Sequence, residues 1–242
     1  MSERVLPPHE RISAGIRATT ASGRTALVPY ITAGYPQKDR FIATLRAIAA
    51  EADVVEIGVP FSDPMADGVT IQRASHAAIA SGVSLRWILA ELSKAAPFDA
   101  PIVLMSYLNP LLNLGYRELA AACVPAGVCG FIVPDLPLEE SADFVAALDA
   151  HGLALIQLVT PATPPERLKM LCTASRGFVY AVTVAGITGG AKELPPEVPD
   201  GSFWTCMIDT NQPSIRGQER FEFGHEYSVT GRSLLLFELH RE

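Results

Sequence analysis

The chain has 242 residues, of which 49% are hydrophobic, so it can bury a sizeable core and does not have the composition of a disordered protein. This length fits one α/β barrel or two small domains, and the formal net charge of −7 argues against a nucleic-acid-binding surface. The four cysteines show no C-x-x-C spacing, and the N-terminus lacks the long apolar core of a signal peptide. No run of ~18 apolar residues occurs either. We therefore expect a cytoplasmic protein without membrane or nucleic-acid partners.

Apolar strands alternate with helical patterns along the first three quarters of the chain. A short first helix is expected over residues 9–22, and later helices are expected around residues 41–49, 69–80 and 84–95, where apolar residues recur at spacings of three or four. The Asn109-Pro110 pair predicts a turn, and Glu139-Glu140-Ser141 predicts an acidic helix start. Six strands are expected: residues 27–32, 54–59, 101–107, 128–135, 153–159 and 177–183.

The second of these strands carries an unusual carboxylate. Glu56 lies inside an apolar run, and a buried carboxyl group must be paired, hydrogen-bonded or protonated. The strand leads into a loop with two prolines and two more acids, Asp63 and Asp67. Two interpretations are open at this point: a structural Glu bonded to neighbouring backbone beside a solvated loop, or an acid–base pair at a strand end.

Polar residues also gather where the other strands end. Thr32, Tyr107, Asp135 and Thr183 follow or close four of the apolar runs, as expected for the carboxyl-end face of a parallel barrel, where such enzymes place their chemistry. Short continuous apolar strands indicate a parallel α/β sheet. A doubly wound sheet is the alternative, although no G-x-G-x-x-G follows the first strand.

Residues 56–72, EIGVPFSDPMADGVTIQ, resemble the signature segment of the tryptophan synthase α subunit at nearly every position. The resemblance covers about residues 9–198. It implies a TIM (β/α)8-type barrel that cleaves indole-3-glycerol phosphate to indole and glyceraldehyde 3-phosphate. It also implies a β subunit as partner in an α2β2 heterotetramer. No cofactor is expected on this chain, because the family's pyridoxal phosphate is carried by the β subunit.

The resemblance also implies roles for individual residues. Glu56 and Asp67 match the two catalytic carboxylates, and Asp63 matches the loop that meets the β subunit. The expected substrate-binding residues are Tyr30, Thr32, Tyr107, Tyr180, Gly186, Thr188 and Gly189, of which the last three belong to a glycine-rich loop that closes over the substrate phosphate. A core position for each tyrosine and a plain turn for the glycine-rich loop are the structural alternatives.

The barrel pattern stops after the sixth strand. We expect an incomplete barrel over residues 1–190, a proline-rich linker over 191–202 and a β-strand tail over 203–242, with strands at 203–208 and 227–237. The tail resembles the terminal strands of glycogen-debranching enzymes, without any of their catalytic motifs. Segments matching the phosphate contacts after strands seven and eight are missing, so a catalytically inactive remnant, or a module that only binds a β subunit, is the alternative to an active lyase.

Overall fold

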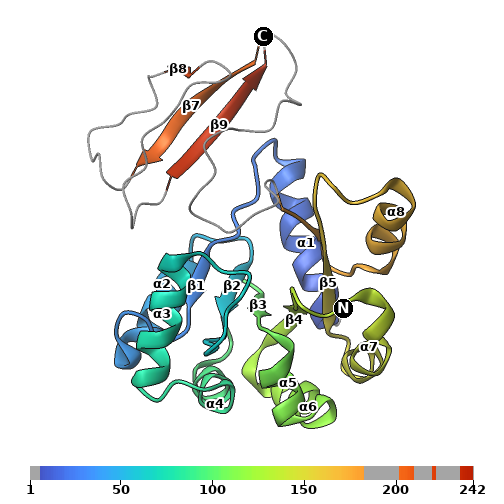
Figure 1. Ribbon diagram of the computed structural model, residues 1–242. Coiled ribbons are helices and arrows are strands. Elements are labelled where there is room, and N and C mark those ends of the chain that lie inside the picture. Colours follow the sequence, from blue (N-terminus) through green and yellow to red (C-terminus); the bar gives the residue numbers. More distant parts are fainter. Residues whose placement is uncertain (1–5, 183–201, 210–219, 222–234, 242) are drawn as a thin grey trace, which may run out of the picture.

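The computed structural model describes residues 6–182, 202–209, 220–221 and 235–241 (Figure 1). Six short parallel strands form its main sheet, and each strand is hydrogen-bonded to the next along the chain. Their bounds are β1 Tyr30–Thr32, β2 Val55–Gly58, β3 Ile102–Met105, β4 Val128–Ile132, β5 Ala154–Val159 and β6 Val179–Ala181. A doubly wound sheet would reverse its strand order at a switch point, and this sheet does not. The six strands therefore form the arc of a TIM-type barrel, as predicted.

Helices cover the outside of this arc, as Figure 1 shows for α2 to α8. The bounds are α2 Phe41–Ala49, α3 Val69–Ala80, α4 Leu85–Ala95, α5 Leu108–Leu114, α6 Tyr116–Ala126, α7 Ala142–Asp149 and α8 Pro165–Ala174, with 3-10 turns η1 Lys38–Arg40 and η2 Leu138–Glu140. The predicted stripe on α4 is confirmed, because Leu85, Ile88, Leu89 and Leu92 are all buried. Ser84 caps this helix by accepting a hydrogen bond from the Trp87 N–H at 3.2 Å.

The first helix, α1 (Pro8–Ala21), lies across the ends at which the strands begin. The His9 N–H donates to the carbonyl of Gly152, just before β5, and the Ser13 hydroxyl donates to the carbonyl of Gly177, just before β6. Ile12 is fully buried in a cluster with the inward-facing side chains of the strands: Val54, Val103, Cys129, Ile132, Ala154 and Ile156. This helix closes the amino end of the arc and leaves the carboxyl end for the loops.

One predicted turn is wrong. Asn109 and Pro110 lie in the first turn of α5 rather than in a loop. The first N–H groups of a helix have no acceptor within the helix, so a proline, which has no N–H, fits there without loss of a hydrogen bond. The helices α6 and α8 were not predicted individually, and α6 accommodates Pro125 in its last turn.

The tail forms a separate antiparallel sheet. Its strands are β7 Ser202–Asp209, β8 Arg220–Phe221 and β9 Leu235–Arg241, with β7 in the middle. Strand β7 contains the strand predicted at 203–208. Of the strand predicted at 227–237, only the last three residues lie in β9, and residues 227–234 are outside the described part. None of the helices in the described ranges combines the length and hydrophobicity needed to cross a lipid bilayer.

Candidate active site

The carboxyl end of the arc brings together most of the residues singled out from the sequence. Tyr30 and Glu56 are register partners on the adjacent strands β1 and β2. Tyr180 lies on β6, and Tyr107 follows β3 directly. The negative charge of Glu56 acts on both Tyr30 and Tyr180, and that of Asp67 acts on Tyr30 and Tyr107. The two carboxyl groups therefore share one set of neighbouring tyrosines.

Glu56 is a buried carboxyl group. Its residue is only 3% exposed, and among the described residues no hydrogen bond or ion pair reaches its carboxylate. Burial without a partner disfavours the charged form, and it raises the pKa of Glu56 to about 7. Near neutral pH this group can both give and accept a proton, as a general acid–base catalyst must.

This raised pKa makes stability depend on pH. Between pH 4.5, the ordinary pKa, and about 7, the unfolded chain loses the Glu56 proton while the folded chain keeps it. The resulting stabilisation is complete below pH 4.5 and is lost as the pH rises, by about 3 kcal/mol in total. We expect urea unfolding to show this loss for the wild type relative to Glu56→Gln, which cannot ionise. If the free energies of unfolding of the two proteins differed by the same amount at pH 4.5 and at pH 8, Glu56 would not be a buried, unpaired carboxyl group.

Asp67 lies in the loop between β2 and α3, where it is half-buried. Its N–H donates to the carbonyl of Pro64 at 3.1 Å, and the Gln72 side chain donates to the Asp67 carbonyl at 2.9 Å. Partial burial raises the pKa of the Asp67 carboxyl, while a hydrogen bond from the Tyr107 hydroxyl opposes that rise. The loop is thus fixed on both sides of the carboxylate, and the two carboxyl groups of the site have unlike environments.

Tyr107 holds this loop rather than only lining a pocket. Its hydroxyl accepts a hydrogen bond from the Ala66 N–H at 2.9 Å and donates to the Asp67 carboxylate. Its ring is stacked on Phe61, with ring centroids 5.2 Å apart. Burial, together with the charge of Asp67, raises the pKa of Tyr107 to about 12, so its hydroxyl remains a donor.

The hydroxyl end of the Tyr30 side chain packs directly over Gly58 of β2, in space that a larger residue would fill. A Cβ atom at Gly58 would come within 2.0 Å of the Tyr30 hydroxyl oxygen, a distance no side chain tolerates. The Thr32 hydroxyl donates to the Tyr30 hydroxyl at 3.4 Å. Burial, with a smaller effect of Asp67 and Glu56, raises the pKa of Tyr30 to about 12. Tyr180 is half-buried, and burial followed by the charge of Glu56 raises the pKa of its hydroxyl as well.

The remaining predicted residues are Asp63 and four residues that the structure does not describe. Gly186, Thr188 and Gly189 lie outside the described residues, as does Thr183. Asp63 is exposed and accepts a hydrogen bond from the Ser62 hydroxyl at 2.5 Å. No group of three His, Cys, Asp or Glu side chains within the described ranges is arranged to hold a metal ion.

The sequence reasoning missed two residues that shape the site. Gly58 interrupts an apolar strand, and a glycine in a strand often marks the close approach of another group. Gln72 follows Asp67 by five residues and belongs to the first turn of α3, which places its side chain back over the loop. Its position in the first turn follows from the helix predicted over 69–80.

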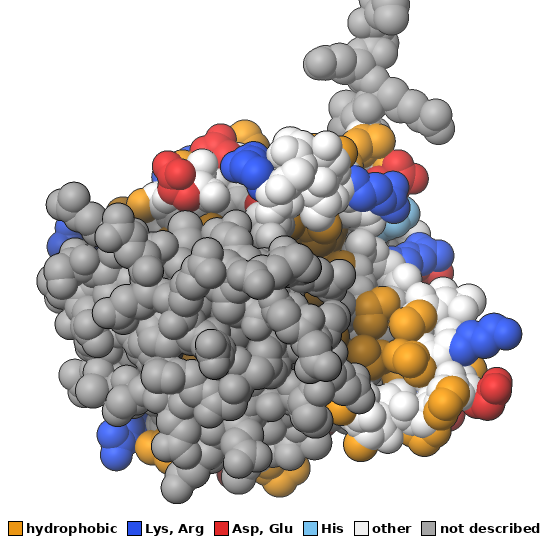
Figure 2. All heavy atoms as spheres, turned by 90° about the horizontal axis from the view of Figure 1, so that it is seen from above, with side chains coloured by type: hydrophobic (Ala, Val, Ile, Leu, Met, Phe, Trp, Pro, Cys, Tyr) orange, Lys and Arg blue, Asp and Glu red, His pale blue; other side chains and the backbone are white. Residues whose placement is uncertain are grey.

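The charged side chains visible on one face of the described part are not sorted by sign. Figure 2 shows one face of the molecule, on which the described Lys and Arg side chains are scattered among acidic and hydrophobic ones.

Comparison with known proteins agrees with the geometry. Residues 16–207 match the family described as "Tryptophan synthase alpha chain". The match runs past residue 198, where we expected the resemblance to end, and into β7. The tryptophan synthase alpha chain of Desulfovibrio desulfuricans is 49% identical over 187 residues, which cover 76% of this chain and 73% of that protein.

Solved structures give the same result. The structure of Mycobacterium tuberculosis tryptophan synthase is similar with a TM-score of 0.70 and 39% identity, over 75% of this chain and 71% of the matched chain. The tryptophan synthase subunit alpha of Legionella pneumophila is similar with a TM-score of 0.68 and 35% identity, over 74% of this chain and 68% of that one.

Proposed function

Because the chain belongs to the tryptophan synthase alpha chain family, we propose that Glu56 and Asp67 are the catalytic carboxyl groups of its lyase reaction. The chain is a lyase of the tryptophan synthase type, acting in tryptophan biosynthesis. Its reaction is the retro-aldol cleavage of indole-3-glycerol phosphate to indole and glyceraldehyde 3-phosphate.

Cleavage of the carbon–carbon bond sets three chemical tasks. The indole C3 must be protonated, the ring N–H must be polarised, and the hydroxyl on the side chain must lose its proton. In our proposal the protonated Glu56 gives its proton to C3 and then takes the hydroxyl proton, so the group is restored after each turnover. The Asp67 carboxylate faces the ring N–H and stabilises the positive charge that develops there.

One observation supports this assignment: Glu56 is buried within β2 without a partner among the described residues, and burial raises its pKa to about 7. A structural glutamate bonded to neighbouring backbone would show such a bond, and none of the described residues supplies one. The pair of carboxyl groups in unlike environments lets one act as the acid and the other remain ionised.

The aromatic residues and the glycine-rich loop complete the proposed site. Tyr30 and Tyr180 line the indole pocket, together with Thr32 and Tyr107. Gly186, Thr188 and Gly189 close over the substrate, and the backbone N–H groups of this loop bind the phosphate. Because the sequence has no segments that match the family's phosphate contacts after strands seven and eight, this loop supplies much of the phosphate binding in our proposal. Binding energy at the phosphate also orients the reacting end of the substrate.

We further propose a β subunit as partner, in an α2β2 heterotetramer in which only the β subunit carries pyridoxal phosphate. The exposed loop around Asp63 is the proposed contact. Beside it lies a groove lined by the side chains of Phe61, Leu85 and Pro110, which offers apolar surface to a partner. The cytoplasm is the proposed compartment, because Cys123 and Cys129 are unpaired thiols. For the tail, the resemblance to debranching enzymes stays a prediction and carries no glycosidase activity.

The experiment that tests the function is product release by the purified full chain. We expect indole and glyceraldehyde 3-phosphate to appear in equal amounts from indole-3-glycerol phosphate, faster when a tryptophan synthase β subunit is added. Binding to the β subunit without release of either product would instead identify a binding module.

A further inference from the structure

Asp135 follows β4 and is not part of the proposed catalytic pair. Its side chain contacts the connection between the neighbouring strand β3 and helix α5. Its Oδ1 atom accepts a hydrogen bond from the Leu108 N–H at 2.9 Å. Leu108 is the first residue of α5, and the residue before it, Tyr107, supplies no side-chain cap to that helix. Asp135 therefore does from another loop what a capping residue does locally: it satisfies an N–H group that the helix leaves free.

This contact fixes the point from which the Tyr107 side chain extends. The backbone around Tyr107 is also held by Ser106, whose hydroxyl donates to the Tyr107 carbonyl at 2.9 Å and whose N–H donates to the carbonyl of Ile132 at 3.0 Å. The contact with Ile132 ties the end of β3 to β4, while the hydroxyl contact holds the backbone of the β3–α5 connection itself. The position of the Tyr107 ring is thus set from the β4 side of the site.

From that position Tyr107 reaches the catalytic loop. Its hydroxyl accepts from the Ala66 N–H at 2.9 Å and donates to the Asp67 carboxylate, and its ring is stacked on Phe61. A continuous set of contacts therefore runs from Asp135, through Leu108 and Tyr107, to Ala66 and Asp67. Catalytic groups need such supporting contacts, since small displacements of a charged group weaken its effect on the transition state.

We propose that Asp135 is a positioning residue for Asp67, acting through Tyr107. The inference rests on the proposed catalytic role of Asp67. Among the described residues Asp135 makes no hydrogen bond or ion pair with Asp67, so its effect on that carboxylate passes through Tyr107, whose pKa the Asp135 charge also raises.

The first test compares Asp135→Ala with Asp135→Asn. Asparagine keeps an oxygen that can accept from the Leu108 N–H, whereas alanine does not. We expect Asp135→Ala to lower kcat for indole release about fivefold, as the loss of one hydrogen bond implies, with little change in KM, and Asp135→Asn to retain most of the activity. Equal losses in both variants would overturn the inference, because they would point to the charge rather than to the hydrogen bond.

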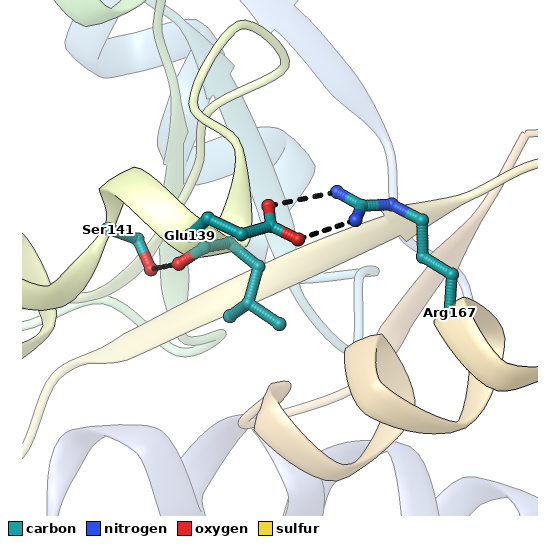
Figure 3. A network of polar contacts seen from close by, with 4 residues as sticks. Glu139, Ser141 and Arg167 are labelled. Atoms are coloured by element: carbon teal, nitrogen blue, oxygen red, sulfur yellow. Dashed lines mark hydrogen bonds and ion pairs between the residues drawn. The ribbon is translucent and has the colours of Figure 1, made fainter.

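The matched control is Glu139→Gln on the same connection between β4 and α7. Figure 3 shows Glu139 in a two-pronged ion pair with Arg167 of α8, at 2.6 and 3.1 Å, beside the bond from the Ser141 hydroxyl to the Leu138 carbonyl. Both partners are exposed, and the network does not include the Tyr107 contacts. We expect Glu139→Gln to leave kcat unchanged. A fivefold loss in this variant would show that any change in the connection slows turnover.

A double-mutant comparison tests the route. In a Tyr107→Phe background the hydroxyl contacts with Ala66 and Asp67 are already absent, so Asp135→Ala should cause no further loss of kcat. The same fivefold loss in both backgrounds would overturn the role of Tyr107.

A readout without turnover separates this inference from the proposed function. Hydrogen exchange of the Ala66 amide reports directly on its bond to the Tyr107 hydroxyl. We expect faster exchange at Ala66 in Asp135→Ala, and wild-type exchange in Asp135→Asn and Glu139→Gln. Faster exchange in a chain that releases no indole would support the positioning contact and refute the lyase assignment. Unchanged exchange in an active chain would refute the positioning contact alone.

Discussion

Glu56→Gln should lower kcat for indole release by roughly a thousandfold or more, within the range that general acid–base catalysis contributes. Glutamine has nearly the same shape as glutamate but cannot exchange a proton near neutral pH. Because Glu56 is buried and unpaired among the described residues, no neighbouring group there is placed to take over its role. The measurement is steady-state release of indole by the purified variant.

The loss must come from chemistry and not from unfolding. At pH 8 the variant avoids a buried ionised carboxyl group, so we expect it to be at least as stable as the wild type. Glu51→Gln is the matched control, since Glu51 is exposed and lies just before β2, at the opposite end of the strand. Full activity of Glu56→Gln, with Glu51→Gln also active, would remove Glu56 from the mechanism.

Asp67→Asn should lower kcat by about a hundredfold to a thousandfold, the usual loss when one group that stabilises developing charge is removed. Asparagine can still accept from Tyr107 but carries no negative charge to place opposite the indole N–H. Because this charge matters in the transition state, we expect a much smaller change in KM. Steady-state kinetics of indole release measures both parameters.

Asp39→Asn, the same change at an exposed site on η1, should leave both parameters unchanged. If Asp67→Asn raised KM and left kcat intact, Asp67 would bind substrate equally in the ground state and the transition state. Its role as a stabiliser of developing charge would then be wrong.

The alternation of apolar strands and helical stripes was enough to predict the arc of the barrel. Strands such as β2 and β5 are short, apolar and buried, and the stripe on α4 has the helical period. The turn predicted at Pro110 failed because a proline in the first turn of a helix and a proline in a loop look alike in sequence. Whether the chain around Pro110 forms a helix depends on an acceptor for the Leu108 N–H, and this acceptor is Asp135 on another loop.

The candidate site likewise has features that the sequence predicts and features that only the folded structure shows. Glu56 could be found from the sequence because a carboxylate inside an apolar strand is exceptional, and burial in the structure explains its pKa of about 7. The contact between Tyr107 and the Ala66 N–H joins residues 41 positions apart, so no local pattern predicts it. The close approach of Tyr30 to Gly58 depends on the register of β1 against β2, which also becomes known only from the folded sheet.

The central claim is that a buried Glu56, protonated near neutral pH, starts the cleavage. The most direct test is the pH dependence of kcat/KM for indole release by the full chain, because this ratio reports the essential groups of the free enzyme. We expect kcat/KM to fall about tenfold per pH unit above a break near pH 7, the pKa of Glu56. A kcat/KM that stays level or rises from pH 6 to pH 9 would contradict the claim.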